Sequence, residues 1–197
     1  LDFILCRLNV SEDNWKVGFF SPENHPLQLH FSKLAEKLIG KSFDKKNHNR
    51  LSPIDLRSAI DYCSENFYFI NPEDDFTINS ILKSVKELIK RKGIKSFVID
   101  AWNKIDHKRG NKDKNDYISE TLDTIVKFCE RNGVHCFLVA HPTKMGKDKD
   151  GKPEVPSLYN ISDSAHFFNK TAKAIDKKYF PDVKYYGDNK KCADVHY

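Results

Sequence analysis

The sequence predicts an α/β domain whose mostly parallel sheet is covered by helices on both faces. Short strand patterns alternate with helical patterns along the chain, and most of the strands are continuous apolar runs, as in strands that are buried on both faces. The length of 197 residues suits one ordinary domain with a sizeable core. We therefore expect a single domain over residues 1–197.

The elements of the first half follow from apolar spacing and from start and stop residues. Residues 1–10 are mostly apolar and have the character of the tail of a helix, and residues 16–20 (KVGFF) form a short strand. A helical pattern at 27–39 stops at a glycine. A second helix starts at a Ser-Pro pair and covers about 53–65, and residues 67–70 form an aromatic strand. We expect these two helices to pack through Leu27, Phe31, Leu34, Leu38, Ile39, Ile54, Leu56, Ile60 and Cys63.

The second half repeats the alternation of helix and strand. A helix from about residue 77 to the glycine at 93 precedes a strand at 95–100, and a helix at 117–132 precedes a strand at 134–140. A long polar stretch with several Gly and Pro residues follows at 141–160, and loops of this length are usually functional or disordered. We expect a short segment at 164–169 and weak strands at 173–175, 183–186 and 192–197.

Composition excludes several classes of protein. Hydrophobic residues are 39% and charged residues 31%, which excludes wholesale disorder, collagen-like sequence and a disulfide scaffold. No apolar run approaches the roughly 20 residues that span a bilayer, so we expect no membrane partner. Five Cys without a CxxC pair, and no signal peptide, indicate reduced thiols in a cytosol-like compartment. The net charge of +5 permits contact with nucleic acid or nucleotides without establishing either.

Three strands end in residues that carry chemistry: Glu23 follows the first strand, Asp100 the third and His141 the fourth. The carboxyl ends of parallel strands meet at one edge of the sheet, so these side chains are expected to converge there. Because strands also end in Asp where a turn follows, Asp100 alone would not indicate a functional site. The prediction of a site depends on Glu23 and His141 at the matching positions of the other strands. Asp100 would hold Mg²⁺ through its water shell, Glu23 would orient or deprotonate a water, and His141 would sense a terminal phosphate. Trp102 and Asn103 are candidates to pack beside a nucleotide, but an indole directly after a buried strand is more often part of the core, so we expect Trp102 there.

Four segments resemble the helicase part of DnaB-like primase-helicases, the group that contains mitochondrial Twinkle and related phage proteins. They read VGFFSPENHPLQLHFSKLAEKLIGKSF, SFVIDAWNKIDH, DYISETLDTIVKFCERNGVHCFLVAHPTKM and DGKPEVPSLYNISDSAHFFNK. The resemblance covers about residues 15–170. It implies a RecA-like P-loop NTPase core that uses ATP and Mg²⁺, assembles as a ring, usually a hexamer, and translocates on single-stranded DNA. By position, Glu23 matches the catalytic glutamate, Asp100 the Walker B aspartate, and His141 the phosphate-sensing residue.

The sequence also departs from the family pattern. A Walker A loop, G-x-x-x-x-G-K-[ST], belongs before the first helix and does not occur in these residues, and the chain stops before the place of the family's arginine finger. We therefore expect a central part of a larger protein that binds ATP weakly by itself. SDS at 162–164 replaces a more usual SGS, and Ala172 stands where related sequences often have Asp.

The polar stretch after His141 matches the family's DNA-contacting loop. Its lysines fit sequence-independent contacts to the phosphates of a single strand, although Asp148 and Asp150 dilute the charge and a solvated loop is an equal alternative. The candidate DNA-binding residues are Lys144, Lys147, Lys149, Lys152 and Lys170.

Three functions compete for this sequence. The leading one is the central part of an ATP-dependent, ring-forming DNA helicase, located in a bacterial or phage-host cytoplasm or in an organelle matrix. The second is a non-catalytic RecA-like module for ring assembly or DNA binding. The third, a metal-dependent nuclease using Glu23 and Asp100, lacks a compact acidic-lysine motif. His25, His107 and His166 lack the spacing of metal ligands, so no zinc site is expected.

Overall fold

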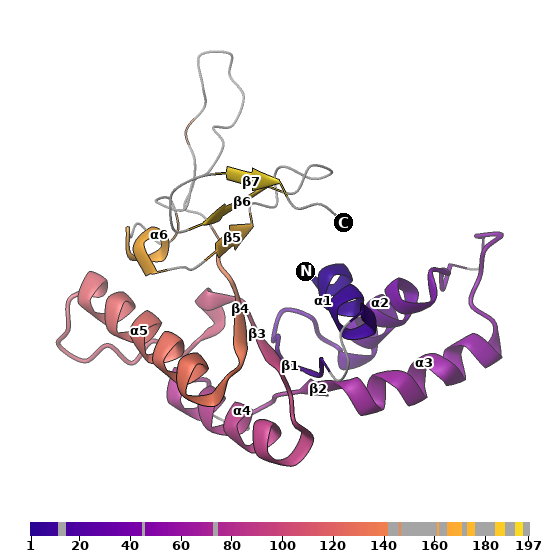
Figure 1. Ribbon diagram of the computed structural model, residues 1–197, viewed down its shortest axis with the longest axis horizontal. Helices are drawn as coiled ribbons and strands as arrows, with labels where there is room; N and C mark the ends of the chain where they lie inside the picture. Colours follow the sequence, from indigo (N-terminus) through magenta and orange to yellow (C-terminus); the bar gives the residue numbers. More distant parts are fainter. Residues whose placement is uncertain are drawn as a thin grey trace. The chain divides into compact units, whose positions relative to one another are not determined.

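The computed structural model describes residues 1–11, 15–44, 46–72, 75–141, 146, 161, 165–170, 173–175, 184–187 and 192–194. They belong to two compact units (Figure 1). The first unit consists of Leu1–His107 and Phe128–Val139, and the second of Lys108–Lys127 and Ala140–Tyr197. The expectation of a single domain stays a prediction.

The first unit is built on a four-stranded parallel sheet. Its strands are β1 (Val17–Phe20), β2 (Phe67–Phe69), β3 (Ser96–Asp100) and β4 (His135–Val139), in the order β2-β1-β3-β4. Every neighbouring pair is parallel, with β1 and β3 in the centre. The carboxyl ends of all four strands therefore lie along one edge, which we name the carboxyl edge, and their amino ends along the opposite amino edge. The α/β class with a parallel sheet is confirmed.

Five α-helices accompany this sheet along the chain: α1 (Asp2–Ser11), α2 (Leu27–Ile39), α3 (Pro53–Asn66), α4 (Ile78–Lys92) and α5 (Lys114–Asn132). A short 3-10 helix, η1 (Trp102–Lys104), follows β3. α5 begins in the second unit and ends in the first. None of the described helices combines the length and the apolar character needed to cross a bilayer.

Local signals set the ends of the helices. The Ser52 hydroxyl accepts a hydrogen bond from the Asp55 N–H, and the Asp55 carboxylate accepts one from the Ser52 N–H, which forms a capping box ahead of Pro53. α4 ends at Gly93, whose φ of 68° is left-handed and whose N–H donates to the Ile89 carbonyl. These ends lie where the sequence predicts them.

The two faces of the sheet are covered by different helices. Val17 and Phe19 of β1 belong to a buried cluster with Leu5 of α1 and Leu34 of α2. On the opposite face, a Cβ added at Gly18 would lie 3.3 Å from a methyl carbon of Leu88 on α4. Alternate residues of β1 thus pack against helices on both sides, as the continuous apolar strand pattern predicts.

The predicted packing faces of α2 and α3 are partly wrong. Leu27, Ile54 and Ile60 are exposed, Ile54 by 79%, whereas α3 buries Ala59 and Cys63. The small side chains of Ala59 and Cys63 let α3 pack closely against its neighbours. With this face buried, Ile54 and Ile60 point towards solvent. α4 buries Ile78, Ile81, Leu82 and Val85, and α5 buries Ile118, Thr121, Leu122 and Ile125.

The second unit carries α6 (His166–Lys170) and a small antiparallel sheet. The strands are β5 (Lys173–Ile175), β6 (Lys184–Gly187) and β7 (Cys192–Asp194), in the order β5-β6-β7. β5 matches the predicted strand at 173–175, and β6 lies one residue beyond the predicted 183–186. β7 covers the first three residues of the predicted 192–197.

Candidate functional site

The candidate site forms at the carboxyl edge, where the segment after β1 meets the end of β3. The two strands are neighbours, with Phe20 of β1 paired to Ile99 of β3, so the residues that follow the two strands lie side by side. Ser21 Oγ donates to Asp100 Oδ2 at 2.8 Å, and Asn24 Nδ2 donates to the same oxygen at 2.9 Å. The peptide bonds His25–Pro26 and Asp100–Ala101 in these segments are cis.

A lysine of α2 extends this network. Lys33 Nζ donates to Asn24 Oδ1 at 2.9 Å, and the amide nitrogen of Asn24 also donates to Ser21 Oγ at 2.7 Å. The amide of Asn24 is therefore held at both its oxygen and its nitrogen. Because its orientation is determined in this way, Asn24 presents its N–H groups to Asp100 rather than its carbonyl.

The hydrogen bonds leave one oxygen of Asp100 available. Both donors reach Oδ2, and within the part of the chain that the structure describes no hydrogen bond reaches Oδ1. Magnesium is commonly held through one or two carboxylates together with waters and substrate phosphates. A single ordered carboxylate with one oxygen available therefore fits the Mg²⁺ role predicted for Asp100.

Glu23 lies on the same edge and forms an ion pair. Its Oε1 is 3.7 Å from Lys104 Nζ of η1, and the two side chains are 32% and 44% exposed. The segments after β1 and β3 thus contact each other through Ser21 and Asn24 with Asp100, and through Glu23 with Lys104. The structure brings Glu23 and Asp100 to one edge, and their catalytic roles stay predictions.

The other predicted site residues belong to the second unit. His141 follows β4 by two residues, and its phosphate-sensing role stays a prediction. Lys144, Lys147, Lys149 and Lys152 lie outside the described residues.

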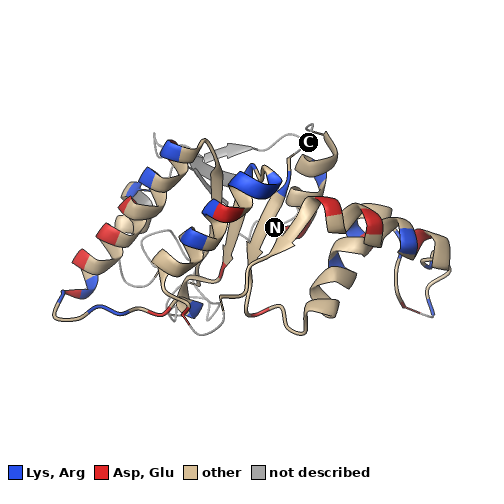
Figure 2. Ribbon diagram, turned by 90° about the horizontal axis from the view of Figure 1, so that it is seen from below, with Lys and Arg blue, Asp and Glu red and all other residues tan. Residues whose placement is uncertain are grey.

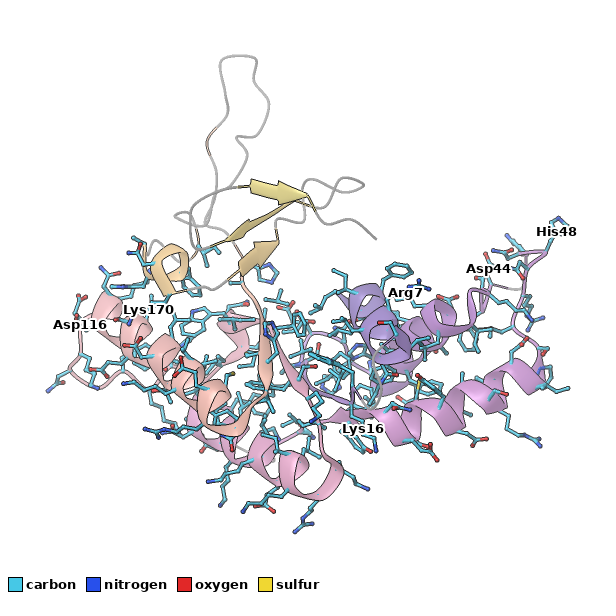
Figure 3. All side chains as sticks on the ribbon, in the orientation of Figure 1. Arg7, Lys16, Asp44, His48, Asp116 and Lys170 are labelled. Carbon is cyan, nitrogen blue, oxygen red and sulfur yellow. The ribbon has the colours of Figure 1, made fainter. Side chains whose placement is uncertain are left out.

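Lys170, at the end of α6, contacts three oxygens of α5 (labelled in Figure 3). Its Nζ lies 2.6 Å from Asp123 Oδ2 and donates to the Ser119 hydroxyl at 2.7 Å and carbonyl at 3.1 Å. The hydrogen bond from Lys170 lowers the pKa of Asp123. In this conformation Lys170 joins α6 to α5, and its contact with DNA stays a prediction.

The core position of Trp102 is confirmed, since its side chain is 4% exposed. Its carbonyl lies 3.1 Å from His107 Nε2. Among the described residues, no group of three or more His, Cys, Asp and Glu side chains is arranged to hold a metal ion.

Sequence reasoning missed Ser21, Asn24, Lys33 and Lys104. The first two could have been found, because SPEN places polar side chains directly after a buried strand. Lys33 carries no such signal, since it reaches the site only through the way α2 folds back over the segment after β1.

Comparison with known proteins shows what this chain is similar to. No family model matches the sequence. A curated protein of Arabidopsis thaliana, "Twinkle homolog protein, chloroplastic/mitochondrial", is 34% identical over 182 residues, which cover 89% of this chain and 25% of that protein. The chain thus spans about a quarter of the length of this relative.

A solved structure shares the fold. The structure titled "ATPase Domain of G40P" superposes with a TM-score of 0.72 over 97% of this chain and 72% of its own, at 14% identity. At that identity the likeness concerns the fold alone. This chain therefore resembles the DnaB/Twinkle-like helicases over most of its own sequence and shares the α/β fold of the ATPase domain of G40P.

Proposed function

We propose that this chain is the central part of an ATP-dependent DNA helicase motor, with its catalytic carboxylates at the carboxyl edge. The observation that carries the proposal is the ordered Asp100 carboxylate, held on Oδ2 by Ser21 and Asn24 on the same edge as Glu23. A strand-end carboxylate with a second carboxylate from the neighbouring strand suits hydrolysis of a nucleoside triphosphate.

Each residue has a distinct role in this proposal. Mg²⁺, when bound through Asp100 and water, neutralises charge on the nucleotide phosphates. Glu23 accepts a hydrogen bond from the attacking water and takes its proton as the new oxygen–phosphorus bond forms. The bond from the γ-phosphorus to the bridging oxygen breaks in the same step, and the nucleoside diphosphate leaves with that oxygen. Lys104 Nζ, 3.7 Å from Glu23 Oε1, positions this carboxylate on the carboxyl edge. His141 contacts the terminal phosphate.

The proposal extends to nucleic acid and to assembly. Single-stranded DNA is the proposed substrate track, and self-association into a ring, usually a hexamer in this family, is the proposed working state. The words "chloroplastic/mitochondrial" in the name of the Arabidopsis relative support location in an organelle matrix. A bacterial or phage-host cytoplasm is the alternative location. The loop contacts to DNA would come from Lys144, Lys147, Lys149, Lys152 and Lys170.

Substitution Glu23→Gln in the full-length protein tests the proposal. Removing the base while keeping the shape should lower kcat for ATP hydrolysis by about 10²- to 10⁴-fold and leave ATP binding nearly unchanged. Glu65→Gln is the matched control. Glu65 is exposed at the end of α3, just before β2 begins, and therefore lies near the amino edge and away from Asp100. Equal losses of binding and turnover would contradict the role of Glu23.

The same assay distinguishes the alternative function. If the unsubstituted full-length protein binds DNA but hydrolyses no ATP in the presence of Mg²⁺, the chain is a non-catalytic RecA-like module. Hydrolysis that DNA stimulates, and that Glu23→Gln abolishes, would exclude this alternative.

A further inference from the structure

One short segment within the described part of the chain is strongly basic. Residues 83–95 contain six basic side chains and one acidic one, a net charge of +5 that equals the net charge of the whole sequence. The rest of the sequence carries 27 basic and 27 acidic residues. The basic residues are Lys83, Lys86, Lys90, Arg91, Lys92 and Lys95.

These cations lie on the outer face of α4 and continue to the amino edge of the sheet. α4 buries Ile78, Ile81 and Val85 against the first unit, and its basic residues are all exposed. The helix lies at the bottom of Figure 1 and faces the viewer in Figure 2, where blue Lys and Arg positions mark its outer face. Because α4 leads directly into β3, its basic end lies opposite the carboxyl edge that holds Asp100.

The amino edge brings a further lysine to this cluster. Lys16 precedes β1 and Lys95 precedes β3, and the Lys95 N–H donates to the Lys16 carbonyl at 2.9 Å. The His135 N–H, at the start of β4, in turn donates to the Lys95 carbonyl at 2.9 Å. Lys16 and Lys95 therefore precede two neighbouring strands, β1 and β3, at the amino edge (Lys16 is labelled in Figure 3). Like charges on neighbouring strands are unfavourable unless an anion compensates them.

Acidic neighbours do not supply that compensation. Glu87 contacts both Lys90 and Arg91, at 3.7 and 3.4 Å, and no acidic side chain in the described ranges pairs with the remaining basic residues of the segment. The partial negative charge at the carboxyl end of a helix favours cations in its last turn, which accounts for Lys90, Arg91 and Lys92. It does not account for the other cations, which are Lys16, Lys83, Lys86 and Lys95.

We propose that this surface, the amino-edge patch, binds the sugar–phosphate backbone of a nucleic acid without reading its sequence. The patch consists of Lys16, Lys83, Lys86, Lys90, Arg91, Lys92 and Lys95. Clustered lysines neutralise successive phosphates and release counterions, which gives affinity for any sequence. The contact goes beyond the proposed motor, because it lies on the edge opposite Asp100 and outside residues 141–170.

The same observations disfavour a membrane as the partner. A helix that binds a bilayer surface exposes apolar side chains between its cations. None of the exposed large apolar side chains in the described part of the chain lies on α4, whose apolar face is buried in the core. The patch therefore presents cations but no exposed apolar side chains of α4 that would insert into a bilayer.

Binding of a fluorescent oligonucleotide, measured by anisotropy without nucleotide, tests the proposal. The triple variant Lys83→Gln, Lys86→Gln, Lys95→Gln removes three cations that have no acidic partner among the described residues. Binding to a single strand should weaken about tenfold or more at low salt, and the slope of log K against log salt should become shallower by about 2, which is three phosphates at about 0.7 each. A duplex of the same sequence, measured in parallel, shows which form the patch prefers.

Two further variants keep the test decisive. Lys46→Gln, Arg50→Gln, Arg57→Gln removes the same charge from exposed positions on and before α3 and should leave the salt slope unchanged. Lys83→Arg, Lys86→Arg, Lys95→Arg keeps the charge and should retain binding. Equal losses in both Gln variants, an unchanged slope in the first, or binding to phosphatidylserine vesicles but not to oligonucleotides would overturn the proposal. Circular dichroism confirms that each variant is folded.

Discussion

Removing the side chain of Asn24 should destabilise the protein through its bond to Asp100. In Asn24→Ala the protein loses three hydrogen bonds: to Asp100 Oδ2 at 2.9 Å, to Ser21 Oγ at 2.7 Å, and from Lys33 Nζ at 2.9 Å. The substitution therefore removes the central member of the network and leaves its outer partners to solvent.

The size of the loss follows from the kinds of bond. A hydrogen bond to a charged group contributes about 1.5–3 kcal/mol, and a neutral one about 0.5–1.5 kcal/mol. Two of the three bonds involve a charged group, Asp100 or Lys33, and the network is partly buried, so the lower values apply and Asn24→Ala should cost about 3–4 kcal/mol. Charge-assisted bonds are about twice as strong as neutral ones, so Asp100→Asn should reduce the cost of Asn24→Ala by about 1 kcal/mol.

A double-mutant cycle measures this coupling. The free energy of unfolding in urea is determined for the protein, for Asn24→Ala, for Asp100→Asn and for the double variant. Asn49→Ala is the matched control, because among the described residues its side-chain amide donates to the Gly40 carbonyl alone, at 3.0 Å, and should not couple to Asp100. If the effects of Asn24→Ala and Asp100→Asn add to within about 0.3–0.5 kcal/mol, Asn24 does not hold the carboxylate.

Two predictions concern titrating groups. The hydrogen bond from Lys41, with those from Ser52, lowers the pKa of Asp55 from 3.8 to about 2. The ionised Asp55 carboxylate therefore stabilises the folded protein fully above about pH 4, and this stabilisation is lost as the pH falls from about 4 to about 2. In Lys41→Ala the pKa of Asp55, followed by NMR, should rise towards 3.8, and an unchanged value would show that Ser52 alone is responsible. Burial raises the pKa of Cys6 to about 12 and of Cys63 to about 11, so at pH 8 both thiols should react with iodoacetamide far more slowly in the folded protein than after unfolding. Rapid labelling of both in the folded state, detected by mass spectrometry, would contradict this burial.

The carboxyl-edge position of the two acidic residues could be predicted from the sequence, because both signals are local. Apolar runs that end in Asp100, or in SPEN with its Glu23, mark strand ends, and parallel strands place such ends together. The hydrogen-bond partners could not be predicted in the same way. Lys33 lies nine residues beyond Asn24, and Lys104 lies far from Glu23 in sequence, so only the packing of α2 and η1 brings each to its partner.

The sequence by itself determined the alternation of helices and strands, the parallel sheet, the start of α3 and the end of α4. Apolar periodicity, the capping box at Ser52 and the left-handed glycine at Gly93 act over a few residues, and tertiary packing does not need to override them. Only the tertiary structure decided which face of α3 is buried, since Ala59 rather than Ile54 meets the core. It also decided which oxygen of Asp100 is held and that the cations of α4 and Lys16 share one edge. These features depend on contacts between residues far apart in the chain, whose energies no local pattern encodes.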